Sequence, residues 1–451
     1  MTTNVSPKPE NSTWTDEQWE AIAVRGRSVL VAAAAGSGKT AVLVERIIRR
    51  ISDPQEPMDV DRLLVATFTK AAAAEMRHRI SDALEKALAE DPGSEHLRRQ
   101  LALIPRASIT TLHSFCMEVI QKHYQTIGLD PGFRIANETE SALLRQELLE
   151  ELLEDRYGAA VEGEPFWLLA DTFSGDKNDE GLFRLIQRLY DDSRSHPWPE
   201  HWLEGCVDMF GAQLATDDHP WLDSLRAAVK LELQGMEGML TEAERLARGP
   251  GGPTPYLANL DDDLTMTRSL LERSEEGPWE LLYEAFHGAA FGKLKPCKGD
   301  QVDKELQEKV KDLRNAAKDK LTQIKEEWFA RSLEEYAQEL EKVHPLMREL
   351  ARLVNEFAEA YRKAKSDKGL VDFADLEHYC LRILCDPATS SPEHPVPSAA
   401  AWEYREQFVE VMLDEYQDTN RVQETIVALI SREQPGNRFM VGDVKQSIVR
   451  P

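Results

Sequence analysis

The sequence has 451 residues, of which 42% are hydrophobic and 30% charged, a balance typical of a globular protein with two or three domains. Its formal net charge of −26 argues against a protein that coats DNA without specificity, although it leaves room for a local basic groove. The sequence has no run of 18 apolar residues and no apolar signal core, and its five cysteines are scattered, so we expect a cytoplasmic protein with no membrane partner.

The first predicted elements form a helix, a strand and a second helix. Residues 1–13 are polar and are predicted to be a disordered lead. A helix is expected over WTDEQWEAIA, where Thr15 and Gln18 have the spacing of a T-x-x-Q capping box. The β-branched run RSVLVAA (27–33) predicts a buried strand, and KTAVLVERIIRRI has helical spacing. A glycine-containing loop connects this strand to this helix.

That loop has the composition of a phosphate-binding loop, although Ala33 takes the place of the usual first glycine. A small residue with negative φ can serve at that place. Backbone N–H groups and a helix N-terminus attract anions, while Lys39 offers a charge to the β- and γ-phosphates and Thr40 offers a hydroxyl to Mg²⁺. The alternative is a glycine turn with no ligand. The predicted nucleotide-binding residues of the loop are Ala35, Gly36, Ser37, Gly38, Lys39 and Thr40.

Two more strand–helix pairs follow. The segments DRLLVATF (61–68) and ASITTL (107–112) predict strands, each followed by a helical pattern. Hydroxyl groups lie where these strands give way to helices, and a helix N-terminus with hydroxyls suits a phosphate. Phe68 can pack against a base or a sugar there, although a place in the core is the ordinary alternative for such a side chain.

The middle of the sequence differs from its two ends. From about Gly128 to Ala364, leucine, glutamate and lysine recur at helical spacing, and strand signals return over 407–416 and 437–443. We therefore predict an α/β fold with a doubly wound parallel sheet built from both ends of the chain, interrupted by a large helical insertion. The predicted divisions are 1–13, 14–127, 128–365 and 366–451.

The returning strand ends in the second chemical motif, VMLDEYQDTN (411–420). Two carboxylates at a strand end lie at the edge of the sheet where such folds bind ligands. Asp414 would hold Mg²⁺ through its water shell, and Glu415 would orient and deprotonate the attacking water. In isolation the motif could equally be an acidic turn. Because Lys39 and Asp414 are distant in sequence, their convergence on one nucleotide is a strong spatial prediction.

Six segments together resemble the superfamily 1 helicases of the UvrD, Rep and RecB kind, and among them the AddA-type subunits of bacterial AddAB helicase–nucleases. They are WTDEQWEAI, AAAAGSGKT, TFTKAAAAEMRHRI, ITTLHSFC, LDEYQDTN and VGDVKQSI, in that order. The resemblance implies a RecA-like P-loop fold and a 3′–5′ ATP-dependent DNA helicase acting in double-strand break repair and homologous recombination. It further implies ATP and Mg²⁺ as cofactors, single- and double-stranded DNA as ligands, and pairing with an AddB-like subunit.

The resemblance also implies roles for single residues. Gln18 would contact the adenine, unless it serves only the capping box, and Gln417 and Gln446 would sense the γ-phosphate. The predicted catalytic residues are Lys39, Glu415 and Gln446. The predicted DNA-contacting residues are Thr67, Phe68, Thr69, Lys70, Thr110, Thr111, His113 and Ser114. The segment GLVDFADLEHYCLRIL (369–384) resembles the place where the chain returns to the motor domain, and it is assigned only an architectural role.

The resemblance covers the front part of such a protein. We expect the second motor domain and the nuclease domain to lie outside this sequence, which ends shortly after VGDVKQSI with Val449 in place of an aromatic residue. One motor domain is expected to bind Mg-ATP and single-stranded DNA but to hydrolyse ATP weakly, because a missing arginine finger costs on the order of 10³–10⁵ in rate. A UvrD-type repair helicase without nuclease, and a nucleotide- or DNA-binding fragment without turnover, stay open as alternatives.

Overall fold

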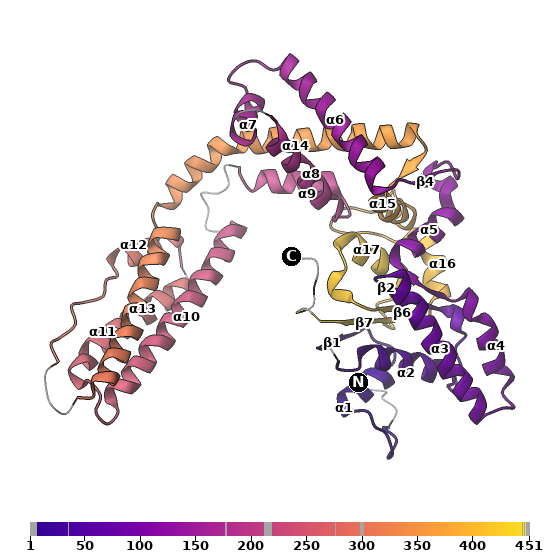
Figure 1. Ribbon diagram of the computed structural model, residues 1–451, viewed down its shortest axis with the longest axis horizontal. Helices are drawn as coiled ribbons and strands as arrows, with labels where there is room; N and C mark the ends of the chain where they lie inside the picture. The colour runs from indigo at the N-terminus through magenta and orange to yellow at the C-terminus, as the bar shows by residue number, and fades with distance from the viewer. Residues whose placement is uncertain are drawn as a thin grey trace. The chain divides into compact units, whose positions relative to one another are not determined.

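The computed structural model describes residues 7–34, 36–175, 178–211, 219–275, 277–297, 302–443, 445 and 447. By its contacts the chain divides into two compact units (Figure 1). The first, called the sheet unit, consists of Met1–Leu203 and Arg352–Pro451. The second, called the helical unit, is Glu204–Ala351.

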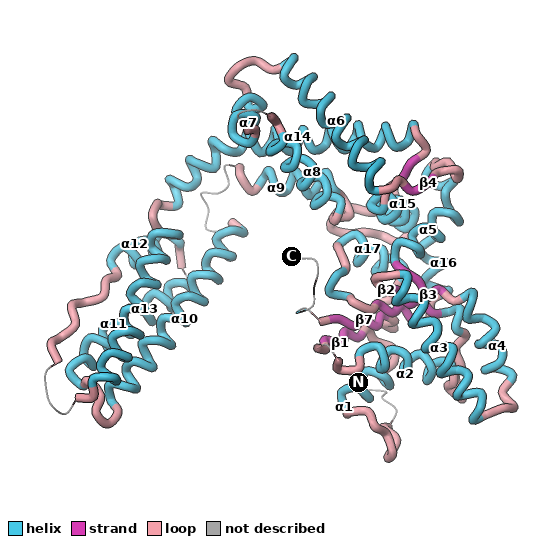
Figure 2. The backbone as a smooth tube through the Cα atoms, viewed as in Figure 1, coloured by secondary structure: helices cyan, strands magenta, loops and turns pink. Residues whose placement is uncertain are grey.

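A parallel sheet forms the centre of the sheet unit (Figure 2). Among the described residues it has five strands in the order β1-β7-β6-β2-β3, and every neighbouring pair is parallel. The strands are β1 (Val29–Ala32), β2 (Leu63–Thr67), β3 (Ser108–Thr111), β6 (Glu410–Leu413) and β7 (Arg438–Gly442). Strands from both ends of the sequence pair with one another, so the predicted α/β fold is confirmed.

Helices cover both faces of this sheet. One face packs against α1 (Asp16–Ala23), α2 (Lys39–Ile51), α3 (Lys70–Glu90) and α4 (Glu95–Leu103). The other packs against α5 (Leu112–His123), α15 (Phe373–Leu384), α16 (Ala399–Gln407) and α17 (Arg421–Ile430). On β6, Met412 points into the first core, and Val411 and Leu413 point into the second. A strand buried on both faces explains why its apolar residues are consecutive.

The sheet unit also contains further helices and a second, smaller sheet. The helices are α6 (Glu138–Ala159), α7 (Pro165–Phe173), α8 (Glu180–Arg194), the part of α9 (Pro199–Asp208) that ends at Leu203, and the part of α14 (Leu333–Asp367) that begins at Arg352. A second parallel sheet pairs β4 (Arg134–Ile135) with β5 (Leu370–Val371). Lys365 of α14 donates to Asp372 at 2.7 Å and to Asp375 at 2.5 Å, so a buried ion pair holds α14 to the start of α15.

The helical unit has its own core. Its helices are α10 (Pro220–Arg248), α11 (Leu257–Glu275), α12 (Trp279–Gly288) and α13 (Lys304–Trp328), together with the N-terminal part of α14. The buried guanidinium of Arg314 donates to both carboxylate oxygens of Asp263, at 2.6 and 3.2 Å. This ion pair is therefore satisfied inside the unit.

The helical unit is shorter than the predicted insertion. The sequence predicts an insertion over 128–365, whereas contacts assign only Glu204–Ala351 to the helical unit and group α6 to α8 with the sheet. The domain boundaries therefore stay a prediction. Within the described ranges, no helix combines the length and apolar character that crossing a bilayer requires.

Candidate functional site

Polar residues gather at one edge of the large sheet. All its described strands are parallel and therefore end on the same side, here called the carboxyl edge. In α/β folds this side is where ligands bind. Lys39 follows β1 after a loop, Asp414 directly follows β6, and Asp443 directly follows β7. Lys39 and Asp414 thus follow β1 and β6, which are separated in the sheet only by β7.

The loop between β1 and α2 is shaped by two glycines. Gly36 and Gly38 have φ values of +75° and +83°, a region that other residues rarely adopt. Gly38 is the N-cap of α2, and no described side chain accepts a hydrogen bond from the first turn of that helix. Ser37 lies between the two glycines and is exposed. The N–H groups of this turn and the helix dipole can therefore receive an anion.

Lys39 is the first residue of α2 and projects a buried ammonium group. Its side chain is 11% exposed, and its Nζ lies 3.8 Å from Glu415 Oε2, beyond hydrogen-bond distance. Among the described residues, this Nζ has no hydrogen-bond partner. A buried charge that no hydrogen bond satisfies is costly, so the position fits an anion that arrives from outside, such as a nucleotide's phosphates. Thr40 follows Lys39 in the same turn.

The two carboxylates follow β6. The backbone N–H of Asp414 donates to the carbonyl of Ala66 on β2 at 2.9 Å, which fixes Asp414 to the sheet. Burial and the charge of Glu415 raise the pKa of Asp414 above its usual value. Glu415 has a φ of +56°, the one positive value among the described non-glycine residues. Such strain persists where surrounding structure imposes it, and it is concentrated at functional sites.

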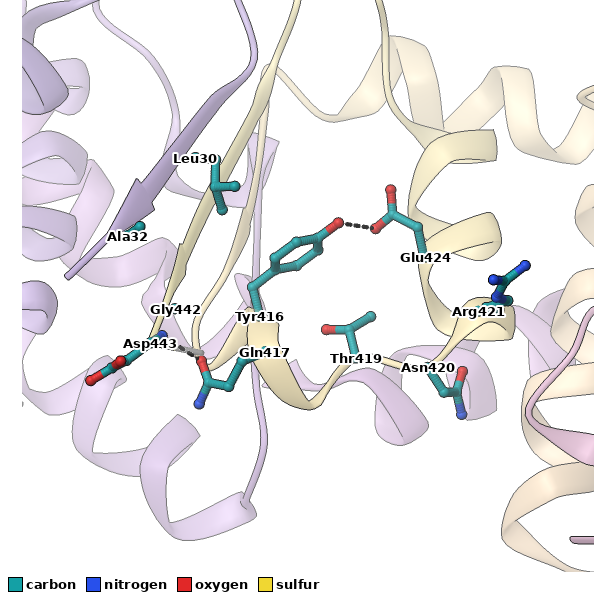
Figure 3. Close-up of a pocket in the computed structure, with 10 residues that line it drawn as sticks. All are labelled: Leu30, Ala32, Tyr416, Gln417, Thr419, Asn420, Arg421, Glu424, Gly442 and Asp443. Atoms are coloured by element: carbon teal, nitrogen blue, oxygen red, sulfur yellow. Dashed lines mark hydrogen bonds between the residues drawn. The ribbon is translucent and has the colours of Figure 1, made fainter. Parts of the chain in front are cut away.

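Gln417 connects the turn after β6 to the end of β7 (Figure 3). Its Nε2 donates to Glu415 Oε2 at 2.8 Å, and its Oε1 accepts from the backbone N–H of Asp443 at 2.9 Å. A Cβ at Gly442 would lie 2.9 Å from the same Oε1, so the glycine permits this approach. One side-chain amide therefore links Glu415 to the neighbouring strand.

Gln18 takes part in two interactions at once. It forms the predicted capping box of α1, since Thr15 N–H donates to its Oε1 at 3.0 Å and its own N–H donates to Thr15 Oγ1 at 3.2 Å. Its Nε2 also donates to the carbonyl of Ser37 in the glycine loop at 3.0 Å. The cap is therefore real and does not separate Gln18 from the loop. Its contact with an adenine stays a prediction.

A buried ion pair holds α2 against β6 at the opposite end from Lys39. Arg46 Nε and Nη2 donate to the two carboxylate oxygens of Glu410, at 2.9 and 3.0 Å. Arg46 Nη1 also donates to the carbonyls of Ala21 and Val24, each at 2.8 Å. This side chain, 3% exposed, fixes α1, α2 and β6 together, and so sets the distance between the loop and the carboxylates.

The residues after β2 divide into buried and exposed ones. Thr67 is buried and its Oγ1 donates to the carbonyl of Thr69 at 3.1 Å. Thr69 caps α3 by accepting from the N–H of Ala72 at 3.0 Å. Phe68 between them is 56% exposed, so it is not a core residue, and Lys70 begins α3 with its side chain exposed. An exposed ring beside a helix N-terminus is compatible with the predicted contact to DNA.

The residues after β3 are engaged in local contacts. Thr110 is the third residue of β3. Thr111 caps α5 by accepting from the N–H of Ser114 at 3.2 Å, and the two hydroxyl oxygens are 2.9 Å apart. His113 Nε2 lies 3.0 Å from Glu377 Oε1. Part of their hydrogen-bonding capacity is thus used within the protein, and their contact with DNA stays a prediction.

Two residues of the segment 369–384, for which the sequence predicts only an architectural role, lie beside His113. Phe373 begins α15, is 55% exposed, and its ring centroid is 5.3 Å from that of His113. Glu377, one turn later on the same helix, is buried and accepts hydrogen bonds from Asn420 and Gln423. The i, i+4 spacing of an aromatic and an acidic residue is the only signal that the sequence offers for them.

A cavity of about 400 Å³ lies between β1, the end of β7 and the segment after β6 (Figure 3). Leu30, which is 59% exposed, contributes an apolar wall, and Tyr416 donates to Glu424 at 3.0 Å. Neither Lys39 nor the glycine loop lines this cavity, so it differs from the predicted phosphate position. Gln417 is among the residues that line it.

Two predicted residues, Ala35 and Gln446, lie outside the described residues. In the described part of the chain, no three His, Cys, Asp or Glu side chains gather as a metal site. Mg²⁺ is usually held by one or two carboxylates together with phosphate oxygens and water. Asp414 and Thr40 therefore fit a Mg²⁺ ion that binds together with a phosphate.

Comparison with known proteins places this site in a family context. The UvrD/REP helicase N-terminal domain family matches residues 14–196 and 259–450. Two proteins named as ATP-dependent helicase/nuclease subunits are similar to the chain: the one from Bacillus pumilus (strain SAFR-032) is 49% identical over 450 residues, and the one from Geobacillus kaustophilus (strain HTA426) is 48% identical over 460. These alignments cover 98% and 100% of the chain, which spans 36% of the length of each relative.

Proposed function

The chain belongs to the UvrD/REP helicase family, and from that premise we propose that it is the ATP-binding motor part of an ATP-dependent DNA helicase. The observation that carries the proposal is the buried ammonium of Lys39, without a hydrogen-bond partner among the described residues and 3.8 Å from Glu415. It lies where a glycine loop opens a helix. A structural lysine would have a partner, whereas a phosphate-binding lysine needs its partner to be the ligand.

The residues around Lys39 divide the chemistry of ATP hydrolysis among them. Lys39 and the N–H groups of α2 bind and orient the phosphates, and Mg²⁺ supplies charge neutralisation when bound with them. Asp414 and Thr40 hold that cation. Glu415 orients a water molecule and takes its proton, and its hydrogen bond from Gln417 at 2.8 Å fixes the carboxylate. Phosphoryl transfer depends mainly on such positioning and electrostatics.

DNA is proposed to lie along the ends of β2 and β3. Phe68 and Phe373 each expose more than half of their side chains at helix N-termini. Base–aromatic stacking contributes about 1–3 kcal/mol per base without demanding a sequence. Lys70 adds a cation beside Phe68, so contact with a phosphate and stacking on a base are available from neighbouring residues.

The activity of the whole protein is proposed from the names of the relatives. They are ATP-dependent helicase/nuclease subunits. We propose that a protein containing this chain is the 3′–5′ translocating subunit of a helicase–nuclease in double-strand break repair and recombination, and that it pairs with an AddB-like subunit.

Two binding titrations test the function of this chain. A fluorescent ATP analogue titrated with Mg²⁺ measures nucleotide binding, and labelled oligodeoxythymidine at low salt measures DNA binding. Phe68→Ala is expected to weaken DNA binding by about tenfold, since one stacking contact contributes about 1–3 kcal/mol. Nucleotide binding in the absence of DNA should not change.

Trp402→Ala is the matched control for the loss of an exposed aromatic ring. Trp402 is 52% exposed, like Phe68, but it lies on α16, which carries none of the predicted DNA-contacting residues. The control should leave DNA binding unchanged. A wild-type chain that binds neither Mg-nucleotide nor single-stranded DNA contradicts the proposed function.

A further inference from the structure

Glu377 is a buried carboxylate on which three elements converge. It lies on α15 and is 4% exposed. Its Oε1 lies 3.0 Å from His113 Nε2 of α5 and accepts from Gln423 Nε2 of α17 at 2.6 Å. Its Oε2 accepts at 3.0 Å from the Nδ2 of Asn420, which caps α17. Both oxygens of one side chain therefore hold side chains from different helices.

The electrostatics fit a carboxylate that stays ionised. Burial opposes the charge, yet the hydrogen bonds from His113 and Gln423, with that from Asn420, lower the pKa of Glu377 below its usual value. Charge-assisted hydrogen bonds of this kind are stronger than neutral ones. The side chain is thus a rigid connector and not a loosely solvated acid.

The contacts of Glu377 lead in two directions. One direction is the predicted DNA surface: His113 packs against the exposed ring of Phe373 with centroids 5.3 Å apart, and Phe373 is one turn from Glu377 on α15. Any movement of the Phe373 ring on a DNA base therefore bears on His113 and, through it, on Glu377.

The other direction is the turn that carries the predicted catalytic carboxylate. That turn begins at Glu415 and ends at Asn420, where α17 starts. Figure 3 shows Tyr416, Gln417, Thr419 and Asn420 of this turn. Gln417 holds Glu415 at the near end of the turn, and Asn420 holds Glu377 at the far end. Because the turn is only a few residues long, a shift at the nucleotide end moves the donor to Glu377.

We propose that Glu377 is a positioning residue that couples nucleotide binding at Lys39 and Glu415 to DNA binding at Phe373. The inference rests on the proposed function and adds to it a residue outside both binding surfaces. Coupling between two ligands is a reciprocal free energy, commonly a factor of about 5–150 in affinity. Glu377 transmits this coupling because its Oε1 contacts His113 on the predicted DNA surface and its Oε2 accepts a hydrogen bond from Asn420 at the end of the turn that carries Glu415.

The test uses variants that break the connection at different points. Glu377→Gln removes the charge and keeps the size. Asn420→Asp keeps the helix cap, since aspartate caps helices as well as asparagine, but replaces the donor to Glu377 with a second carboxylate. Asp263→Asn is the control for losing a buried carboxylate, because Asp263 pairs with Arg314 inside the helical unit.

Four dissociation constants are measured for each protein: oligodeoxythymidine with and without Mg²⁺ and a non-hydrolysable ATP analogue, and the analogue with and without the oligonucleotide. The wild-type chain is expected to show a coupling factor of at least about fivefold. In Glu377→Gln and Asn420→Asp that factor is expected to fall to below about twofold, while each ligand alone binds within about threefold of wild type. Asp263→Asn should keep the wild-type factor.

The outcomes separate this inference from the proposed function. A wild-type chain that binds neither ligand overturns the proposed function. A wild-type chain that binds both with no coupling, or variants that keep the wild-type factor, overturn the role of Glu377 and leave the proposed function standing. Thermal unfolding checks that each variant is folded. Gln423→Met, which removes the donor from α17 to Glu377 Oε1, replaces any variant that is not, and the same result is expected of it.

Discussion

The two ends of the α2–β6 contact show how a scaffold differs from a site. At one end, Arg46 and Glu410 are both buried and share two hydrogen bonds, and Arg50 Nε lies 2.9 Å from the same carboxylate. At the other end, two helical turns away, Lys39 is buried without a hydrogen-bond partner among the described residues, and burial and a neighbouring charge raise the pKa of Asp414. The same helix and strand supply both ends.

The two ends differ in how much of their hydrogen-bonding capacity is used within the protein. Arg46 also donates to the backbone carbonyls of Ala21, Ile22 and Val24, so its hydrogen-bonding capacity is used inside the protein. Lys39, Asp414 and the first N–H groups of α2 have hydrogen-bonding capacity that is available to a ligand. A folded chain tolerates such unsatisfied charge only where the remaining structure holds it in place. Changes at the two ends should therefore separate stability from binding.

The largest expected effect is on the scaffold. Arg46→Met should lower the free energy of unfolding by about 3 kcal/mol, the lower end of the range for breaking a buried ion pair, because buried Glu410 keeps only Arg50 as a cationic partner. Urea unfolding followed by circular dichroism measures this loss. The triple variant Arg46→Met, Arg50→Met and Glu410→Leu should recover most of it, since none of the three paired charges is then left. A loss below about 1 kcal/mol in the single variant would mean that this pair does not hold α2 to β6.

The second effect should appear in binding alone. Lys39→Met removes the ammonium group, whose Nζ has no hydrogen-bond partner among the described residues, so the dissociation constant for the Mg²⁺-bound ATP analogue should rise by about 10- to 100-fold, the usual value of hydrogen bonds to a charged group. The free energy of unfolding without nucleotide should stay the same or increase. Titration and urea unfolding of the same preparation measure both quantities. A clear loss of stability would show that Lys39 has a structural partner.

The sequence predicts this contrast only in part. Strand–helix alternation and the motifs GSGKT and LDEYQDTN are local patterns, and by themselves they predict that Lys39 and Asp414 lie at strand ends. The Arg46–Glu410 pair could not be predicted in this way, because its members are 364 residues apart and neither lies in a motif. Glu377 lies in a segment (369–384) that resembles a family motif, but its partners come from α5 and α17, and no local pattern predicts that these helices converge on it.

The third effect depends on pH. The pKa of Asp414 is raised in the folded chain, so folding favours its protonated form, and stability falls as pH rises from the usual value of 3.8 through the raised pKa. Asp414→Asn removes this penalty. It should therefore raise the free energy of unfolding at pH 7 by about 0.5–1 kcal/mol, a small single-site effect, and the gain should disappear toward pH 4. Unfolding measured across that range shows whether it does.

The same substitution should also cost the protein its response to Mg²⁺. Wild-type protein should melt at a higher temperature with Mg²⁺ and the ATP analogue than with the analogue alone, since a ligand that binds only the folded state stabilises it. Asp414→Asn should lose this difference. Glu410→Gln, at the saturated end of the same strand, should instead be less stable at pH 7. If both variants behave alike, the two ends of β6 do not differ as described.

The smallest effect concerns Gln18, which both caps α1 and contacts the glycine loop of the predicted nucleotide site. Gln18→Glu keeps the capping box, which accepts either residue, but loses the donor to Ser37. Stability should not change, and the affinity for the ATP analogue should fall by about threefold, the usual value of a neutral hydrogen bond. Thr15→Ala removes the cap and should therefore lower stability while leaving the affinity for the ATP analogue unchanged. If Gln18 contacts the adenine, Gln18→Glu will weaken binding of the adenine nucleotide more than that of the guanine nucleotide; if it only holds the glycine loop, both will weaken equally.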